Sequence, residues 1–155
     1  GMHAVAGPLT GQKLTPMFLE HTSWKDWLTA HPSTVVLSTR TGSFRNYDRD
    51  PYAGYGESSE LFFDTTHIDS RYHPKEWVIG IEIQGVTKAY PFLELKKVSS
   101  PVADQVNGQR VIVRYNASSR SASVIDEQGK AIPSVTAFWF AWYAFHPDTQ
   151  VFTPP

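Results

Sequence analysis

The sequence contains no cysteine. This absence excludes disulfide bonds, thiol nucleophiles and cysteine-based zinc or iron–sulfur sites, and it leaves the redox compartment undecided. Long hydrophobic runs are missing as well. The longest apolar run extends from Ala137 to Phe145, far short of the roughly 20 residues that cross a bilayer. We therefore expect no membrane insertion.

An excess of charge of either sign is also missing. Lys and Arg number 14 against 15 Asp and Glu, and no basic block exceeds the pair Lys96-Lys97. This balance gives no electrostatic reason to expect nucleic acid as a partner. The chain has 155 residues, of which 41% are hydrophobic, so it is long enough to bury a core. We expect one soluble domain spanning residues 1–155.

Two segments of the chain share the pattern W-x-x-W-x-x-x-H-P-x-T-x-V. They cover residues 24–37 and 139–152. Tryptophans three positions apart lie on one face of a helix, and proline disfavours helix in the residue before it, so each helix should end near its histidine. A β-rich run follows the first histidine at residues 34–38. The pattern predicts a helix, a His-Pro turn and a strand, used twice.

The second of these segments is dense in aromatic residues between Phe138 and Phe145. A helix that is hydrophobic nearly all round belongs in a core, and packing is the commoner use of Trp and Phe at helical spacing. An aromatic shelf for a sugar or a base is the functional alternative. His31 and His146 each end one helix, where a positive imidazolium is favoured by the helix dipole or where histidine could act as a general base.

The remaining segments predict an α+β fold, mainly antiparallel β-sheet with a few short helices. Gln84-Gly85 and Asn107-Gly108 are turn signals between runs of alternating hydrophobicity, and each predicts a β-hairpin. The predicted strands cover residues 78–84, 86–90, 103–106, 110–115 and 120–126, and a short helix is predicted over residues 91–97.

The loop from Thr41 to Gly56 is the strongest candidate for a binding site. Arginine and aspartate alternate among tyrosines in it. Guanidinium groups bind carboxylate or phosphate, and tyrosine adds flat contact area with a hydroxyl. The alternative is an Arg–Asp network that only pins the loop. The residues that we expect to hold a small polar or anionic ligand are Arg45, Arg49, Asp50, Tyr52 and Tyr55.

Potential metal ligands and general bases gather after this loop. His67, Asp69, His73 and Glu76 have no recognised zinc spacing, so we expect neither a metal site nor a cofactor. No nucleophile elbow, phosphate loop or dinucleotide fingerprint is present. If the chain is instead a hydrolase or a metal-assisted enzyme, the candidate catalytic residues are His73, His146, Asp50 and Glu82.

Several stretches carry a resemblance to a known family, namely residues 6–11, 27–32, 45–55, 73–76, 78–85, 88–91, 138–142 and 146–147. On these stretches the chain resembles the bacterial domain of unknown function 3179 family, and specifically the C-terminal part of its longer members. The resemblance implies that an N-terminal half of the pattern is missing here, with Gly1 as the remnant of a cleaved tag. It also implies association with that half, or homo-oligomerisation, as the partner interaction.

The family pattern has reactive side chains where this chain has inert ones. Tyr115 is kept, but Asn116 and Ser119 stand where the pattern has two cysteines, and Ser99 and Ser100 stand where it has a His-Glu pair. The resemblance therefore implies that thiol or metal chemistry is absent from this segment. We expect a non-catalytic or accessory domain that binds a small polar ligand or another part of its parent protein. Relatives often look exported, which allows a periplasmic location.

Overall fold

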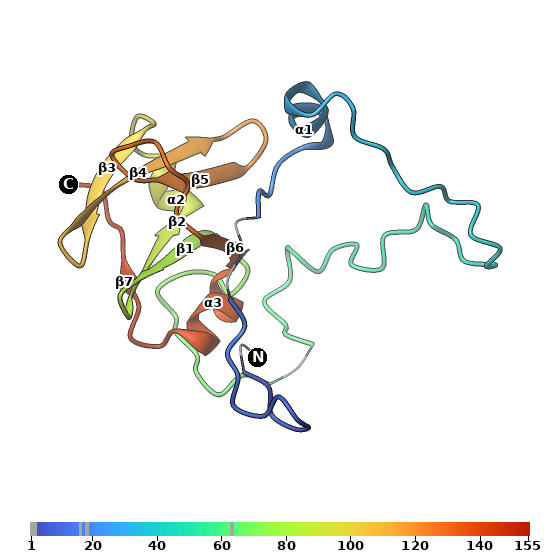
Figure 1. Ribbon diagram of the computed structural model, residues 1–155, viewed down its shortest axis with the longest axis horizontal. Coiled ribbons are helices and arrows are strands. Elements are labelled where there is room, and N and C mark those ends of the chain that lie inside the picture. The colour runs from blue at the N-terminus through green and yellow to red at the C-terminus, as the bar shows by residue number, and fades with distance from the viewer. Residues whose placement is uncertain (1–2, 16, 18, 63) are drawn as a thin grey trace.

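The structure is a computed structural model, and it describes residues 3–15, 17, 19–62 and 64–155. The fold is α+β, as predicted from the sequence. In the described part of the chain, seven strands form two mostly antiparallel sheets, accompanied by three short helices (Figure 1). Burial is confined to the second half: Lys75 is the first described residue whose side chain is buried.

The first sheet has the strand order β6-β1-β2-β7. Its strands are β1 (Trp77–Ile83), β2 (Val86–Pro91), β6 (Ser134–Phe138) and β7 (Gln150–Val151). The predicted hairpin is confirmed, because β1 and β2 pair antiparallel around a turn in which Gln84 and Gly85 have φ values of 50° and 84°. Such positive φ values are what the Gln84-Gly85 turn signal requires. Strand β6 pairs antiparallel with β1, whereas β7 pairs parallel with β2.

The second sheet has the order β3-β4-β5, with β3 (Val102–Val106), β4 (Gln109–Asn116) and β5 (Ser121–Ile125). The second predicted hairpin is confirmed here, with Asn107 and Gly108 at its turn and both at positive φ. Helix α2 (Phe92–Leu95) joins the two sheets and is shorter than the helix predicted over residues 91–97.

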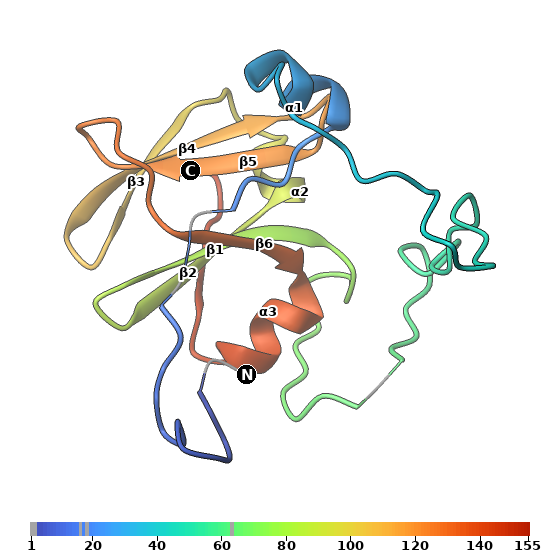
Figure 2. The ribbon, with the colours of Figure 1, turned by 45° about the vertical axis from the view of Figure 1, so that its right-hand side comes forward.

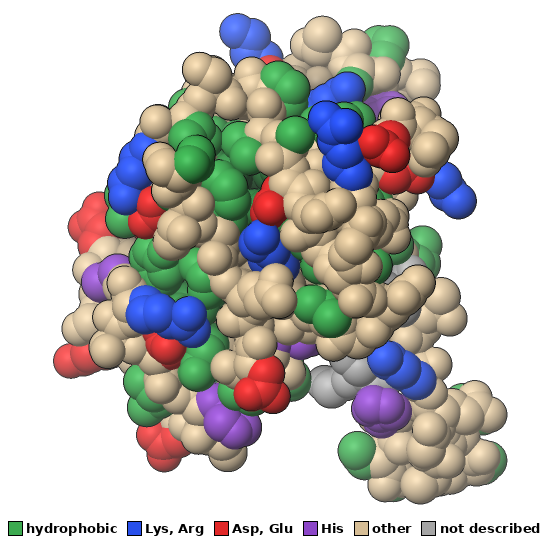
Figure 3. All heavy atoms as spheres, turned by 90° about the vertical axis from the view of Figure 1, so that its left-hand side faces the viewer, with side chains coloured by type: hydrophobic (Ala, Val, Ile, Leu, Met, Phe, Trp, Pro, Cys, Tyr) green, Lys and Arg blue, Asp and Glu red, His purple; other side chains and the backbone are tan. Residues whose placement is uncertain are grey.

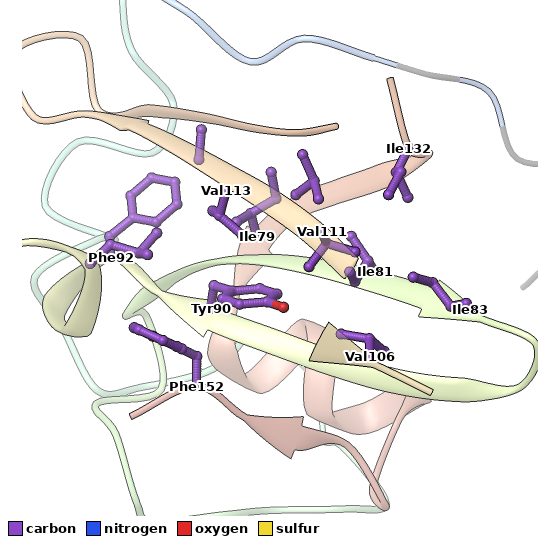
Figure 4. Packing of buried hydrophobic residues seen from close by; sticks show 13 residues of the cluster. Ile79, Ile81, Ile83, Tyr90, Phe92, Val106, Val111, Val113, Ile132 and Phe152 are labelled. Atoms are coloured by element: carbon purple, nitrogen blue, oxygen red, sulfur yellow. The ribbon is translucent and has the colours of Figure 1, made fainter. Parts of the chain in front are cut away.

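The main hydrophobic core lies between the two sheets. Figure 4 shows side chains of β1 and β2, such as Ile79, Ile81 and Tyr90, lying against Val111 and Val113 of β4. All five are almost fully buried. Burying each such side chain stabilises the fold by about 1.5–3 kcal/mol, so this layer holds the sheets together.

An ion pair crosses from one sheet to the other. Lys88 on β2 places its Nζ 2.6 Å from Oδ2 of Asp104 on β3, and both side chains are largely buried. Burial alone would raise the pKa of Asp104, but the ion pair with Lys88 and the hydrogen bond from the Gln105 N–H outweigh it, and the pKa lies below its usual value. Burial, followed by the nearby Asp104 charge, raises the pKa of Tyr90. Asp104 is therefore ionised in the folded protein at neutral pH.

Helix α3 (Trp139–Phe145) covers the opposite face of the first sheet, so that sheet lies between α3 and the second sheet (Figure 2). Trp139 and Trp142 form a second buried cluster with Val78 and Ala89. A Cβ placed on Gly80 would lie 2.4 Å from the Trp142 indole, so the indole packs directly on the β1 backbone. The expected role of the aromatic segment in a core is therefore correct for this helix.

Helix α1 (Trp24–Ala30) begins at Ser23, whose Oγ accepts a hydrogen bond from the Asp26 N–H. This is a regular N-cap. No residue of α1 is buried, so the first helix of the repeated pattern, unlike the second, lies outside the core. The strand predicted over residues 34–38 is also absent from this described segment. Its backbone finds no neighbouring strand, because residues 32–50 loop away from the two sheets (Figures 1 and 2).

On the face that Figure 3 shows, Lys and Arg side chains are interspersed with Asp and Glu. That face carries no patch of a single charge sign of the kind that steers nucleic acid binding. Among the helices that the structure describes, none has the length and apolar character needed to span a bilayer.

Candidate functional site

A pocket of about 650 Å³ opens beside the main core. It lies where the start of β1 and helix α2 meet the end of β4, and loop residues 54 and 56–57 form part of its wall. Trp77, Phe92 and Phe138 supply apolar surface to it. The charged or titratable side chains that line it are Glu57, His73, Lys75, Glu76, Lys96 and Arg120.

Lys75 is the most buried charged residue of this pocket, with 4% of its surface exposed. Its Nζ donates hydrogen bonds to the backbone carbonyls of Ser58, at 2.6 Å, and Glu60. The same ammonium lies 3.6 Å from the centroid of the Tyr55 ring, a cation–π contact. Lys75 therefore fastens residues 55–60 to the start of β1. Its ammonium is held by backbone carbonyls and an aromatic ring, and it forms no ion pair with a carboxylate of a described residue.

Aromatic rings form one side of the site. Tyr55 stacks on Phe62 with centroids 4.1 Å apart and meets Phe138 edge-on at 6.4 Å. Phe138 in turn lies 4.5 Å from Trp77. The contacts of Tyr55 with Phe62, Phe138 and Lys75 explain why this tyrosine is half-buried while its neighbours in the loop are exposed.

Tyr115 contributes an unusual hydroxyl. The residue lines the pocket, and its Oη is buried without a hydrogen-bond partner in the described part of the chain. Burial raises the pKa of Tyr115; the Arg120 charge lowers it and the Glu76 charge raises it. A buried hydroxyl normally finds a partner, so the unpaired Tyr115 hydroxyl is an exception in this fold.

The positive charges of the pocket are free of carboxylates. None of Lys75, Lys96 and Arg120 forms a salt bridge with a described residue. Glu76 is committed elsewhere, because its Oε1 accepts a 2.7 Å hydrogen bond from the Leu93 N–H in the first turn of α2. The lining thus offers three cations, not counting His73, against the carboxylates of Glu57 and Glu76.

None of the five residues predicted to hold a ligand lines this pocket. Tyr55 lies beside the pocket through its contact with Lys75. Tyr52 is exposed, and its N–H donates to Asp50 Oδ1 at 2.8 Å, so that Asp50 serves the turn. Arg45 and Arg49 are exposed on the preceding loop, and neither forms a salt bridge with a described residue.

The two candidate catalytic histidines lie in separate surroundings. His73 lines the pocket, and its Nδ1 accepts a 3.2 Å hydrogen bond from the Lys75 N–H. His146 instead ends α3 and lies 4.0 Å, centroid to centroid, from Trp142. Burial lowers the pKa of His146, and the Glu82 charge opposes this effect. Of the described His, Asp and Glu side chains, no three are grouped to hold a metal ion.

The positions at which the family pattern has reactive residues lie close together. Ser100 Oγ accepts a 2.9 Å hydrogen bond from the Tyr115 N–H, which brings the segment of Ser99 and Ser100 beside the end of β4. Asn116 follows directly and its Oδ1 accepts hydrogen bonds from Ser118 and Ser119. Ser100 thus lies beside the backbone of Tyr115, and Asn116 follows Tyr115 in the chain, but none of the four positions lines the pocket.

Lys75, Lys96 and Arg120 were missed as site residues in the sequence. They come from the start of β1, the end of α2 and the turn before β5, so only the tertiary fold brings them together. The one local signal was Tyr115, the residue of the family pattern that this chain retains.

The class of the protein follows from these features: an α+β domain of two packed sheets with a polar pocket at their edge. The family model described as Protein of unknown function (DUF3179) matches residues 1–149. The chain belongs to this family, and the resemblance inferred from the sequence is confirmed. Comparisons with curated proteins and with solved structures each found no match.

Proposed function

We propose that this domain binds a small organic ligand bearing a carboxylate or phosphate group in the pocket at Tyr115, without transforming it. The observation that carries the proposal is the presence of Lys96 and Arg120 around one pocket, neither of them paired with a carboxylate of a described residue. The buried ammonium of Lys75 adds positive charge beside them, although its own donors are already used by the Ser58 and Glu60 carbonyls. Positive groups held near one another in a concave site attract an anion, and arginine adds a bidentate hydrogen-bonding face.

The dimensions and walls of the pocket support a ligand larger than an inorganic ion. Small-molecule sites typically enclose about 300–1,000 Å³ and combine apolar walls with a few polar groups. Trp77, Phe92 and Phe138 suit an apolar or ring-shaped body, while Lys96 and Arg120 suit its polar end.

An accessory role without catalysis is supported by the four positions at which the resemblance implies cysteines and a His-Glu pair. Asn116, Ser119, Ser99 and Ser100 are poor nucleophiles and poor metal ligands, because none is readily ionised near neutral pH. The competing function is a hydrolase that uses His73 as a general base, and its support is that His73 lines the same pocket.

Thermal unfolding with defined probes tests the binding function. Citrate, phosphate and glucose 6-phosphate would be compared with uncharged glucose. A ligand at about 100 times its Kd stabilises the folded state by about 2.7 kcal/mol and raises the Tm by roughly 5 °C or more. We expect such a shift with an anionic probe, and its loss in R120Q and K96Q. Lys130→Gln, an exposed lysine outside the pocket, should keep the shift.

The same assay separates binding from catalysis. The accessory function predicts that H73Q keeps most of the anion-dependent shift and that the added probe is recovered unchanged after long incubation. Equal shifts in the parent protein, R120Q and K96Q would refute the pocket as the anion site, whereas conversion of a probe by the parent but not by H73Q would establish the enzyme.

A further inference from the structure

The two Trp-containing segments fold into the same local unit, here named the α1 unit (residues 24–37) and the α3 unit (residues 139–152). In the α1 unit, Trp27 Nε1 donates to Thr34 Oγ1 at 3.0 Å. In the α3 unit, Trp142 Nε1 donates to Thr149 Oγ1 at the same distance. Both hydrogen bonds tie the helix to the segment that follows its His-Pro turn.

The turns match as closely as the side chains. His31 has φ −131° and ψ 68°, and His146 has φ −135° and ψ 65°. Each imidazole lies against the second indole of its own helix, with centroids 4.2 Å apart in the α1 unit and 4.0 Å in the α3 unit. The α1 unit therefore has the same geometry as the α3 unit, and contacts within the α1 unit are sufficient to hold that geometry.

The α3 unit shows which surface this geometry fits. Its second indole, Trp142, lies on the backbone of Gly80 in β1. Its strand β7 pairs parallel with β2, and the Phe152 N–H donates to the Ala89 carbonyl at 2.9 Å. The recognised surface is thus a β-hairpin with a glycine under the indole and a strand edge open to a parallel neighbour.

The α1 unit presents the same groups without that surface. Trp24 is 53% exposed where the equivalent Trp139 is 0% exposed, and Leu37 is 96% exposed where Phe152 is 7% exposed. Val36, the equivalent of the paired Val151, is exposed too. The α1 residues that correspond to these buried α3 residues therefore have no sheet packed against them in the described part of the chain.

We propose that the α1 unit docks on a second glycine-bearing β-hairpin, outside residues 75–155, whose chemistry matches that of β1 and β2. Trp27 would lie on the glycine, as Trp142 lies on Gly80. Residues 35–37 would add a parallel strand to the open edge, a form of strand addition in which backbone hydrogen bonds supply affinity and side chains supply specificity.

The β1–β2 hairpin of a second copy of this chain is not the occupant. Its Gly80 is already covered by Trp142, and its β2 edge is already paired with β7. Docking there would require the α3 unit to leave. A glycine hairpin whose face and edge are both open has no such competitor.

A cyclised peptide with the sequence of residues 77–91, confirmed as a hairpin by NMR, is the probe for this proposal. It would be added to the full chain, and amide hydrogen exchange would be followed by mass spectrometry. We expect at least tenfold slower exchange over residues 34–37 at saturation, together with a shift of the Trp27 indole N–H resonance. The same peptide with Gly80→Val should have no effect, because the added side chain occupies the place of the indole.

Protein variants complete the test. W27A should lose the protection, whereas K25Q, on the same helix, should keep it. Unchanged exchange at residues 34–37 at millimolar peptide would overturn the proposal, and so would equal protection by the Gly80→Val peptide. Protection that appears with protein concentration alone, without peptide, would make a second copy the occupant and would contradict the proposal.

Discussion

The α1 and α3 units share one sequence pattern and one local geometry, yet one is exposed and the other is part of the core. In both, the second indole hydrogen-bonds a threonine seven residues later at 3.0 Å. The buried side chains of α3 are Trp139 and Trp142, whereas α1 has none. Local sequence is therefore sufficient to shape the unit, and it is insufficient to bury it.

The difference lies in what each unit meets. Trp142 is buried because Gly80 lets the indole reach the backbone of β1, and β7 exists as a strand because β2 offers an edge. The α1 unit has an N-cap at Ser23, while α3 begins with its Trp139 and Phe140 N–H groups bonded to carbonyls of Glu76 and Pro74. The free N–H groups at the start of a helix need acceptors. In exposed α1 an acceptor comes from the cap residue next to the helix, and in buried α3 the acceptors come from a distant segment of the chain.

Removal of the second indole should separate the two units most strongly. We expect W142A to lower the free energy of unfolding by about 3–5 kcal/mol, because a large buried side chain is replaced by a cavity. The equivalent W27A should lower it by less than about 1 kcal/mol. Urea denaturation of both variants gives the comparison, and similar losses would show that α1 is packed in solution.

Filling the glycine under the indole should have the next largest effect. We expect G80A to cost about 2–3 kcal/mol, since its Cβ would lie 2.4 Å from the Trp142 indole and the helix would have to move. Gly56→Ala is the matched control, because a Cβ there meets nothing within 4 Å. The same denaturation assay applies. Equal stability of the two variants would contradict direct packing of α3 on β1.

Loss of the threonine acceptor gives a smaller contrast. T149V leaves the buried Trp142 indole N–H without a partner and should cost about 1–2 kcal/mol. T34V should cost less than about 0.5 kcal/mol, because the half-buried Trp27 indole can turn to water. Thermal unfolding monitored by near-UV circular dichroism measures both. A larger loss of stability in T34V than in T149V would contradict the assignment of α3 to the core and of α1 to the surface.

Acid should reveal the smallest difference. Burial holds the pKa of His146 below its ordinary value of 6.5. As the pH falls below about 6.5, the unfolded chain therefore takes up a proton before the folded protein does, and stability declines by less than about 1 kcal/mol. H146Q should remove this decline between pH 7 and 5.5, and H31Q should leave it in place. Urea denaturation at several pH values measures this decline in stability. If the decline persists in H146Q, another titratable group causes it.

Much of the second half of the fold could be predicted because its signals are local. The two hairpin turns are encoded by Gly85 and by Asn107-Gly108, residue types that accept positive φ, and Gln84 adopts positive φ beside Gly85. Strand β6 was missed because residues 134–138 become a strand by pairing with β1, more than 50 residues earlier. The strand wrongly predicted over residues 34–38 has the right composition, but β-propensity needs a neighbouring strand.

The site was harder to predict than the fold. Arg45 and Arg49 attracted attention because they cluster in the sequence, yet they lie on an exposed loop. The pocket cations Lys75, Lys96 and Arg120 are spread over more than 40 residues and share no motif. Only the packing of the two sheets brings them to one place, so periodicity and spacing carried no information about it.

Hydrogen exchange of the two indole N–H groups, measured by NMR in one sample, compares the α1 and α3 units without any substitution. We expect the Trp142 N–H to exchange only when the sheet and α3 separate, and therefore several orders of magnitude more slowly than the Trp27 N–H. Comparable protection of both indoles in the isolated chain would mean that the α1 unit already has its packing surface, and would contradict the account.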